Sequence, residues 1–415
     1  MSRRRADRAA ALGALALAAC DVRALDPGRS PVDAGGDGAC GRGVAVISIG
    51  DDYQSANVSA LGVDGAVLSG SLLSSASRPP GLVAPLGGDA VLPSLPQRGG
   101  RIAVIDRYPS GVVTWIDLAT ASVPAQLDVR TGFTSNPHDL VEVAQGKAYV
   151  TRYERNHRAG REPHDAGDDL LIVDPSVPRV LGRVDLVPAM AGREPFLPRP
   201  DRAVLAGGRV LVVLAGYTAD FADAADGRVV AIDPATDSID EVLVLPGLRG
   251  CAGAAVSPTG AEIAVSCPGL LLSDSLDDSA IVRVRVEPPL TEIARYPAST
   301  LGAGKVGFRA AYASGGLLLT AVFGREASPA APALEDSLVE LDLGGGTARE
   351  LLRSSGAPFT LGDPVCLDAC GVCFAPDAGR RVVHRLAVGE ATVDSPVPLP
   401  VEEALGLRPR QLGAL

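Results

Sequence analysis

The chain has 415 residues, of which 47% are hydrophobic, 21% charged and 4% aromatic, and its 48 Gly and 33 Pro indicate many turns. This composition excludes a coiled coil, a collagen and a wholly disordered chain, and it predicts a loop-rich globular protein. The formal net charge is −11, and Lys147 and Lys305 are the only lysines. Nucleic acid is therefore not expected as a partner, because phosphate binding requires a basic surface.

Residues 1–19 have the pattern of a secretory signal peptide. Arg3, Arg4 and Arg5 precede an uncharged run from Ala9 to Ala19, which is too short to cross about 30 Å of hydrocarbon as a helix. The run ends in Leu-Ala-Ala-Cys20, which closely resembles the lipobox of bacterial lipoproteins.

This resemblance implies that the signal is cut before Cys20, and that lipid on Cys20 anchors the chain to a membrane. The expected location is the bacterial cell envelope, at the inner or outer membrane, facing the periplasm or the cell surface. An ordinary secreted protein that is cut nearby, with Cys20 incidental, is the alternative reading. Residues 20–43 are rich in Asp, Gly, Pro and Arg, and we expect a flexible tether there, with the folded domain spanning 44–415.

The domain consists of repeats of one strand pattern. Residues 226–267 form the clearest unit, with four short alternating or β-branched runs separated by turns such as Asp233–Asp237 and Ser257–Gly260. The same order of runs recurs from seven starting points, near residues 56, 111, 168, 226, 279, 336 and 380. Seven units of about 55 residues predict seven four-stranded blades.

The last unit ends after its third strand, and an unassigned strand, Val44–Ser48, has the pattern of the missing fourth. We therefore predict an all-β fold, a seven-bladed β-propeller in which the N-terminal strand closes the last blade and leaves no long sheet edge unpaired. The runs Val229–Asp237 and Ala255–Gly260 are similar to the YVTN-type propeller repeat, and this resemblance, over residues 44–415, implies the same fold.

Six cysteines remain besides Cys20, and an even number in an exported chain predicts disulfides. Cys251 and Cys267 flank the Ser257–Gly260 turn symmetrically, so they are expected to lie opposite each other on adjacent strands and to pair.

Cys366 and Cys373 bracket the equivalent hairpin two units further on, and we expect them to pair in the same way. That assignment leaves Cys40 for Cys370. Four cysteines allow three pairings, so the connectivity of this group stays open.

A marker in the third strand of each unit places several polar residues at equivalent positions. The marker is a Pro or small residue before an apolar pair, and the polar residues are Arg78, Asn136, Arg199, Asp363 and Arg408, with His138 and Asp139 just after one of them. If these positions face the mouth of the channel, they form a collar suited to an anionic small molecule or a protein with an acidic segment. Alternatively, the arginines pair with carboxylates of neighbouring blades.

Two functions fit these features. The first is a membrane-anchored, non-enzymatic scaffold that binds a partner; the second is a lactonase-like hydrolase or isomerase at the channel mouth, since some YVTN-like propellers are lactonases. His138 and Asp139 are the only candidate dyad for the second, and it is weak because alternate strand residues point in opposite directions. We assign no catalytic residue, no cofactor and no metal site from the sequence.

Overall fold

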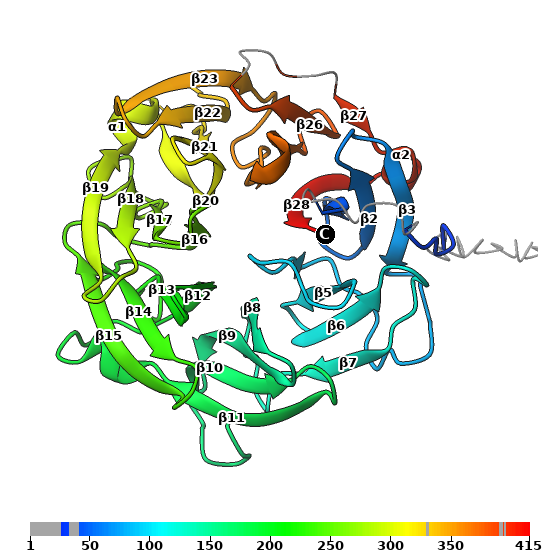
Figure 1. Cartoon of the computed structure of the whole chain (residues 1–415), viewed down its shortest axis with the longest axis horizontal. Coiled ribbons are helices and arrows are strands. Elements are labelled where there is room, and N and C mark those ends of the chain that lie inside the picture. The colour runs from blue at the N-terminus through cyan, green and yellow to red at the C-terminus, as the bar shows by residue number, and fades with distance from the viewer. Residues whose placement is uncertain (1–25, 33–40, 329–331, 390–392, 394–395) are drawn as a thin grey trace, which may run out of the picture.

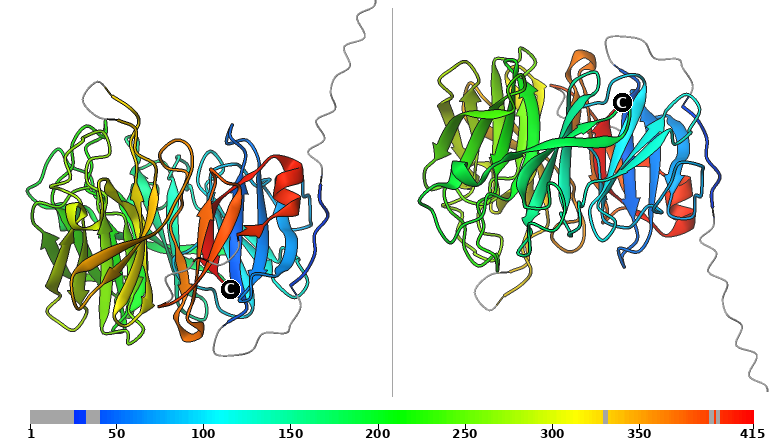
Figure 2. Two further views of the ribbon diagram at one scale, coloured as in Figure 1. Left: turned by 90° about the horizontal axis from the view of Figure 1, so that it is seen from above. Right: turned by 90° about the horizontal axis from the view of Figure 1, so that it is seen from below.

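The computed structural model describes residues 26–32, 41–328, 332–389, 393 and 396–415. These residues form seven four-stranded antiparallel sheets arranged in a ring (Figure 1). Seen from the side, the sheets stand like blades around a common axis and together make a disc (Figure 2). The prediction of a seven-bladed β-propeller is confirmed.

Six blades use four consecutive strands each, counted from the axis outwards. They are β4 (Ala90–Val91), β5 (Arg101–Asp106), β6 (Val112–Asp117) and β7 (Ala125–Asp128); β8 (Pro137–Ala144), β9 (Lys147–Arg155), β10 (Gly167–Asp174) and β11 (Arg179–Asp185); β12 (Pro200–Ala206), β13 (Arg209–Leu214), β14 (Gly227–Asp233) and β15 (Ser238–Leu245); β16 (Gly253–Val256), β17 (Glu262–Cys267), β18 (Ala280–Arg285) and β19 (Thr291–Pro297); β20 (Lys305–Ser314), β21 (Leu317–Phe323), β22 (Ser337–Asp342) and β23 (Thr347–Arg353); and β24 (Val365–Leu367), β25 (Val372–Asp377), β26 (Val382–Ala387) and β27 (Val397–Pro398). Four short helical turns lie in the connections, namely η1 (Val187–Met190), α1 (Ala298–Leu301), η2 (Asp368–Cys370) and α2 (Pro400–Leu405).

The seventh blade joins the two ends of the described chain. Its innermost strand is β28 (Arg408–Ala414), followed outwards by β1 (Gly43–Ile49), β2 (Ala56–Gly62) and β3 (Val67–Ser74). In the register of β1 with β28, Val44 lies opposite Ala414 and Ile49 opposite Arg408. The predicted closure through the N-terminal strand is therefore confirmed.

The sequence repeat is out of phase with the blades. The unit at residues 226–267 supplies β14 and β15, the outer half of one blade, and then β16 and β17, the inner half of the next. Each unit thus links two neighbouring blades, and the blade boundary falls inside the repeat.

Burial follows the position of a strand in its blade. The third strand β14 is apolar on both sides, with Val229, Val230, Ala231 and Ile232 all at 0% exposure, because adjacent blades cover both faces of the sheet. The residues of the outermost strand β15 are exposed or partly buried, except for the buried Leu245 at its end. The core is accordingly divided into clusters between neighbouring blades.

Two predicted disulfides are confirmed. Cys251 and Cys267 are bonded, with their Cα atoms 3.7 Å apart, and Cys366 and Cys373 are bonded across β24 and β25, where they are direct partners in the register. The pairing of Cys370 with Cys40 stays a prediction, because Cys40 lies outside the described residues.

The segment before β1 is not entirely a loose tether. Within residues 26–32, the backbone N–H of Ser30 donates to Ser71 in β3, and that of Val32 donates to Leu118. Val32 is 1% exposed and belongs to the core cluster between the first two blades. The tether predicted for residues 20–43 therefore contains a docked part that its polar composition did not reveal.

The signal peptide and Cys20 lie outside the described residues. Across the part of the chain that is described, no helix has the length and apolar character needed to span a membrane.

Candidate functional site

The two faces of the disc differ in their exposed aromatic side chains. All innermost strands begin on one face, here called the start face, which also carries the connections between blades; the opposite face is the end face. Five aromatic residues among those described are 38–61% exposed, and all five lie on the start face, namely Tyr53, Tyr108, Phe221, Phe308 and Phe359. Single exposed apolar residues are ordinary, but such a gathering on one face indicates a binding surface.

Three of these aromatics surround a cavity of about 190 Å³ at the inner rim of the start face. Tyr53, Phe308 and Phe359 line it together with the buried Phe323. The ring of Phe323 lies 5.1 Å from that of Phe308 and 4.8 Å from that of Phe359, so the three phenylalanines form one cluster. Phe323 and Phe359 also line a second, smaller cavity beside it, of about 70 Å³, which includes Leu271.

Three of the exposed aromatic residues have a backbone conformation that glycine and asparagine adopt more readily than an aromatic residue does. Tyr53, Phe221 and Phe359 have φ of +55°, +60° and +65°, in the left-handed region. Glycine and asparagine adopt this region readily, whereas a bulky residue there is strained. Since such strain tends to persist where function requires the side chain, these positions are candidates for a functional role.

The charged groups at this cavity are only partly neutralised. Arg107 forms an ion pair with Asp89. Arg410 donates a hydrogen bond of 2.9 Å to the carbonyl of Phe359, and among the described residues no carboxylate pairs with it. Burial raises the pKa of Asp363, whose carboxylate accepts a hydrogen bond from the backbone of Arg309.

Arg199, a member of the predicted collar, is buried rather than open to the channel. Its guanidinium bonds Glu154 at 2.8 Å and lies 3.9 Å from the ring centre of Phe221 and 5.2 Å from that of Tyr153. The guanidinium of Arg199 thus packs against the ring of the exposed Phe221 in a cation–π contact. For Arg199 the alternative holds in which the arginine pairs with a carboxylate of a neighbouring blade.

Of the other predicted collar residues, Arg408 and Asn136 also stand at the start of an innermost strand, whereas Arg78 does not. Arg408 lies at the start of β28 and pairs with Asp51, 2.6 Å away. Asn136 directly precedes β8, with a φ of +48°. Arg78 is exposed in the connection between β3 and β4, where it bonds the carbonyls of Ser75 and Ser77. The Arg78 marker was wrongly placed in a strand, because the innermost strand of that blade begins at Ala90.

His138 is paired with Asp201 and not with Asp139. The Nδ1 of His138 lies 2.9 Å from Asp201 Oδ1, and its ring stacks on Tyr153 with centres 4.3 Å apart. Asp139 points elsewhere and accepts backbone N–H groups of Ser94 and Ala203, joining three blades. The dyad predicted from adjacency was therefore wrong in its acidic partner, for the reason that neighbouring strand residues point apart.

We predict a stability effect of pH that depends on His138. Burial lowers its pKa below 6.5, so the unfolded chain takes up a proton near pH 6.5 that the folded protein does not. The contribution of neutral His138 to stability is present above pH 6.5 and is lost as the pH falls towards the folded pKa. The free energy of unfolding should decrease between about pH 7.5 and about pH 5.5 by more in the wild type than in His138→Asn. The exposed His157→Asn is the control, and an equal decrease in the wild type and His138→Asn would contradict the assignment.

Sequence reasoning missed the exposed aromatics, because it searched for polar and titratable groups. A usable signal existed, since the chain has only 7 Phe, 7 Tyr and 1 Trp, and several of them stand in segments expected to be turns. Asp201 lies two residues after Arg199, so the alignment of the units had reached the strand that holds it.

Comparisons with known proteins agree with the fold. No protein-family model matches the chain, and no curated protein matches it in sequence. Among solved structures, a putative 6-phosphogluconolactonase from Bacteroides fragilis is similar with a TM-score of 0.55 at 12% identity, over 90% of this chain and 97% of that one. The β-propeller domain of Cps50 (Swd1) from Myceliophteria thermophila is similar with a TM-score of 0.56 at 12% identity, over 84% and 98%. At this identity the likeness establishes the propeller fold alone.

Proposed function

We propose that this chain is a lipid-anchored protein of the bacterial envelope whose propeller binds a partner protein through its start face, without catalysis. The observation that carries the proposal is the placement of all five exposed aromatic side chains of the described residues on that face. Aromatic residues dominate the energetically important centres of protein interfaces, where they fill pockets on the partner.

The backbone strain at Tyr53 and Phe359 supports the same proposal. Each residue has a positive φ, and both line the start-face cavity. Asparagine would fit these backbones better, so an aromatic side chain at each position has a cost to stability of order 1 kcal/mol. A binding role for the rings explains why these positions hold aromatics.

The docked segment at residues 26–32 supports a close attachment to the membrane. Because Val32 is buried against the first two blades, the chain is fixed to the disc there. Asp26 is six residues after Cys20 in the sequence, and an extended chain of that length reaches at most about 20 Å. A lipid on Cys20 would thus hold the disc near the membrane surface, where its face could meet a membrane-associated partner.

The proposal is tested by the double variant Tyr53→Asn/Phe359→Asn. Its free energy of unfolding should stay within about 1 kcal/mol of the wild type or rise, because asparagine accommodates the left-handed backbone. In a crosslinked pull-down from native membranes, the partner captured by the wild type should be lost.

The matched control is Val177→Asn/Leu181→Asn, which removes two exposed apolar residues of the β10–β11 hairpin, away from the start face. This control should retain the partner. A double aromatic variant that folds and captures the same proteins as the wild type would overturn the start face as the binding surface.

A lactonase-like hydrolase is the second candidate, favoured by the His138–Asp201 pair. Asp201 orients Nδ1, and Nε2 of His138 has no hydrogen-bond partner among the described residues, as a general base would require. His138 lines none of the cavities described, which is why we rank this function second. Hydrolysis of gluconolactone by the wild type that falls at least about 100-fold in His138→Asn would favour the hydrolase.

A further inference from the structure

A larger cavity opens near the axis on the side of the end face, apart from the aromatic cluster. Its volume is about 330 Å³, and it is lined by residues of the innermost strands β12, β16, β20, β24 and β28. The connection from β4 to β5 forms one wall, because β4 has only two residues and the chain then crosses beside the axis as Pro93–Pro96. The volume lies at the lower end of the range for small-molecule sites.

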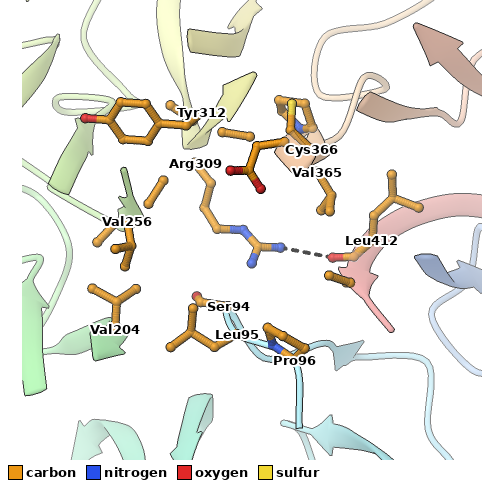
Figure 3. Close-up of a pocket in the computed structure, with 18 of the residues that line it drawn as sticks. Ser94, Leu95, Pro96, Val204, Val256, Arg309, Tyr312, Val365, Cys366 and Leu412 are labelled. Carbon is orange, nitrogen blue, oxygen red and sulfur yellow. Dashed lines mark hydrogen bonds between the residues drawn. The ribbon is translucent and has the colours of Figure 1, made fainter. Parts of the chain in front are cut away.

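Most of the residues that line this end-face cavity have apolar side chains. Figure 3 shows Val204, Val256, Leu95, Val365 and Leu412 around the opening. Arg309 and Asp368 are the only charged residues in the lining, and Asp368 is exposed. Arg309 is therefore the one buried charged side chain among the described residues that line the cavity.

Arg309 has an incomplete set of hydrogen-bond partners. Its side chain is 8% exposed, and its guanidinium reaches the middle of the cavity (Figure 3). Nη2 contacts Gln411 Oε1 and the carbonyl of Leu412 at the long distances of 3.4 and 3.5 Å. Nε has no acceptor, its nearest carboxylate oxygen being 3.6 Å away on Asp363, and the described residues offer Nη1 no hydrogen bond.

Arg309 and its neighbour Arg202 form ion pairs with carboxylates only at the long distance of 3.6 Å. Burial and the charge of Arg309 lower the pKa of the neighbouring Arg202 to about 10. Arg202 donates hydrogen bonds to the carbonyls of Leu92 and His138, and its ion-pair partner Asp201 lies 3.6 Å away. The carboxylate of Asp139 already accepts hydrogen bonds from the backbone N–H groups of Ser94 and Ala203. A ligand with a negatively charged acceptor would supply the hydrogen-bond acceptors that Arg309 lacks. A carboxylate suits this position because a guanidinium can form two parallel hydrogen bonds with it.

We propose that the end-face cavity binds a small monocarboxylate with an apolar body. The carboxylate accepts hydrogen bonds from Arg309, and the apolar part packs between Val204, Val256 and Leu95. A single guanidinium does not suit a polyanion, because the other charges of the ligand would be buried without partners. This inference concerns a site separate from the start face and does not rest on the proposed function.

The test is titration calorimetry with sodium hexanoate as the probe and hexan-1-ol as its uncharged analogue. Hexanoate should bind the folded wild type saturably, and the alcohol should bind at least about 10-fold more weakly, since it lacks the charge that strengthens hydrogen bonds from a guanidinium. Arg309→Gln should weaken hexanoate binding by at least about 10-fold as well. Arg295→Gln, on an outer strand with its own partner Glu292, should leave binding unchanged.

A second variant keeps the test decisive if Arg309→Gln does not fold. Val256→Phe fills the cavity while keeping the guanidinium, and it should abolish binding of both probes. Absence of saturable hexanoate binding to the wild type, or unchanged affinity in a folded Arg309→Gln or Val256→Phe protein, would overturn the proposed site.

Discussion

Replacing Arg152 with methionine should lower the free energy of unfolding by about 3–5 kcal/mol. Arg152 and Asp169 have fully buried side chains and form a two-pronged ion pair, with Nε to Oδ1 at 2.8 Å and Nη2 to Oδ2 at 2.7 Å. The same guanidinium bonds the carbonyl of His164 and lies 5.0 Å from the ring centre of Phe133. Removing the cation leaves the carboxylate of Asp169 buried and short of its main partner.

Chemical denaturation of three variants checks this expectation. Arg179→Met removes a cation whose side chain is 64% exposed and 3.7 Å from Asp174, so it should change stability by less than about 0.5 kcal/mol. The double variant Arg152→Met/Asp169→Leu should recover part of the loss, because it removes both buried charges. If Arg152→Met and Arg179→Met lowered the free energy of unfolding equally, the buried ion pair would not be an important contribution to the stability of the β9–β10 pairing.

Replacing Cys20 with alanine should move the protein from the membrane fraction to the soluble fraction. The expectation rests on the lipobox-like run before Cys20, because without the thiol no diacyl group is attached, and stable anchoring requires more than one acyl chain. The measurement is fractionation of cells followed by detection of the protein, with Cys40→Ala as the cysteine control that should stay with the membrane. Membrane association that survives in Cys20→Ala would refute the lipid anchor.

Much of the fold could be predicted from the sequence because it is repetitive and locally encoded. Turn residues such as Asp233 and Asp237 recur with the apolar strand runs, so the number of units and the closure by Val44–Ser48 followed from pattern alone. The phase between unit and blade could not be predicted, because a repeat has the same sequence wherever the blade boundary is drawn. That boundary depends on which strand lies nearest the axis.

The site was predicted less well because it depends on long-range neighbours. Arg199 directly precedes the innermost strand β12, but its partners are Glu154 in β9 and Phe221 in the connection between β13 and β14. His138 pairs with Asp201, which is 63 residues away. The Arg78 marker failed because β4 is reduced to two residues, so the unit has no regular third strand there.

The most direct test of the start face as a binding surface is site-specific photocrosslinking in native membranes. A photoreactive phenylalanine analogue at Phe359, on the start face, is compared with the same analogue at Val177, in the β10–β11 hairpin. The account predicts a discrete protein adduct from position 359 and none from position 177. The absence of any adduct from 359, or the same adducts from both positions, would contradict it.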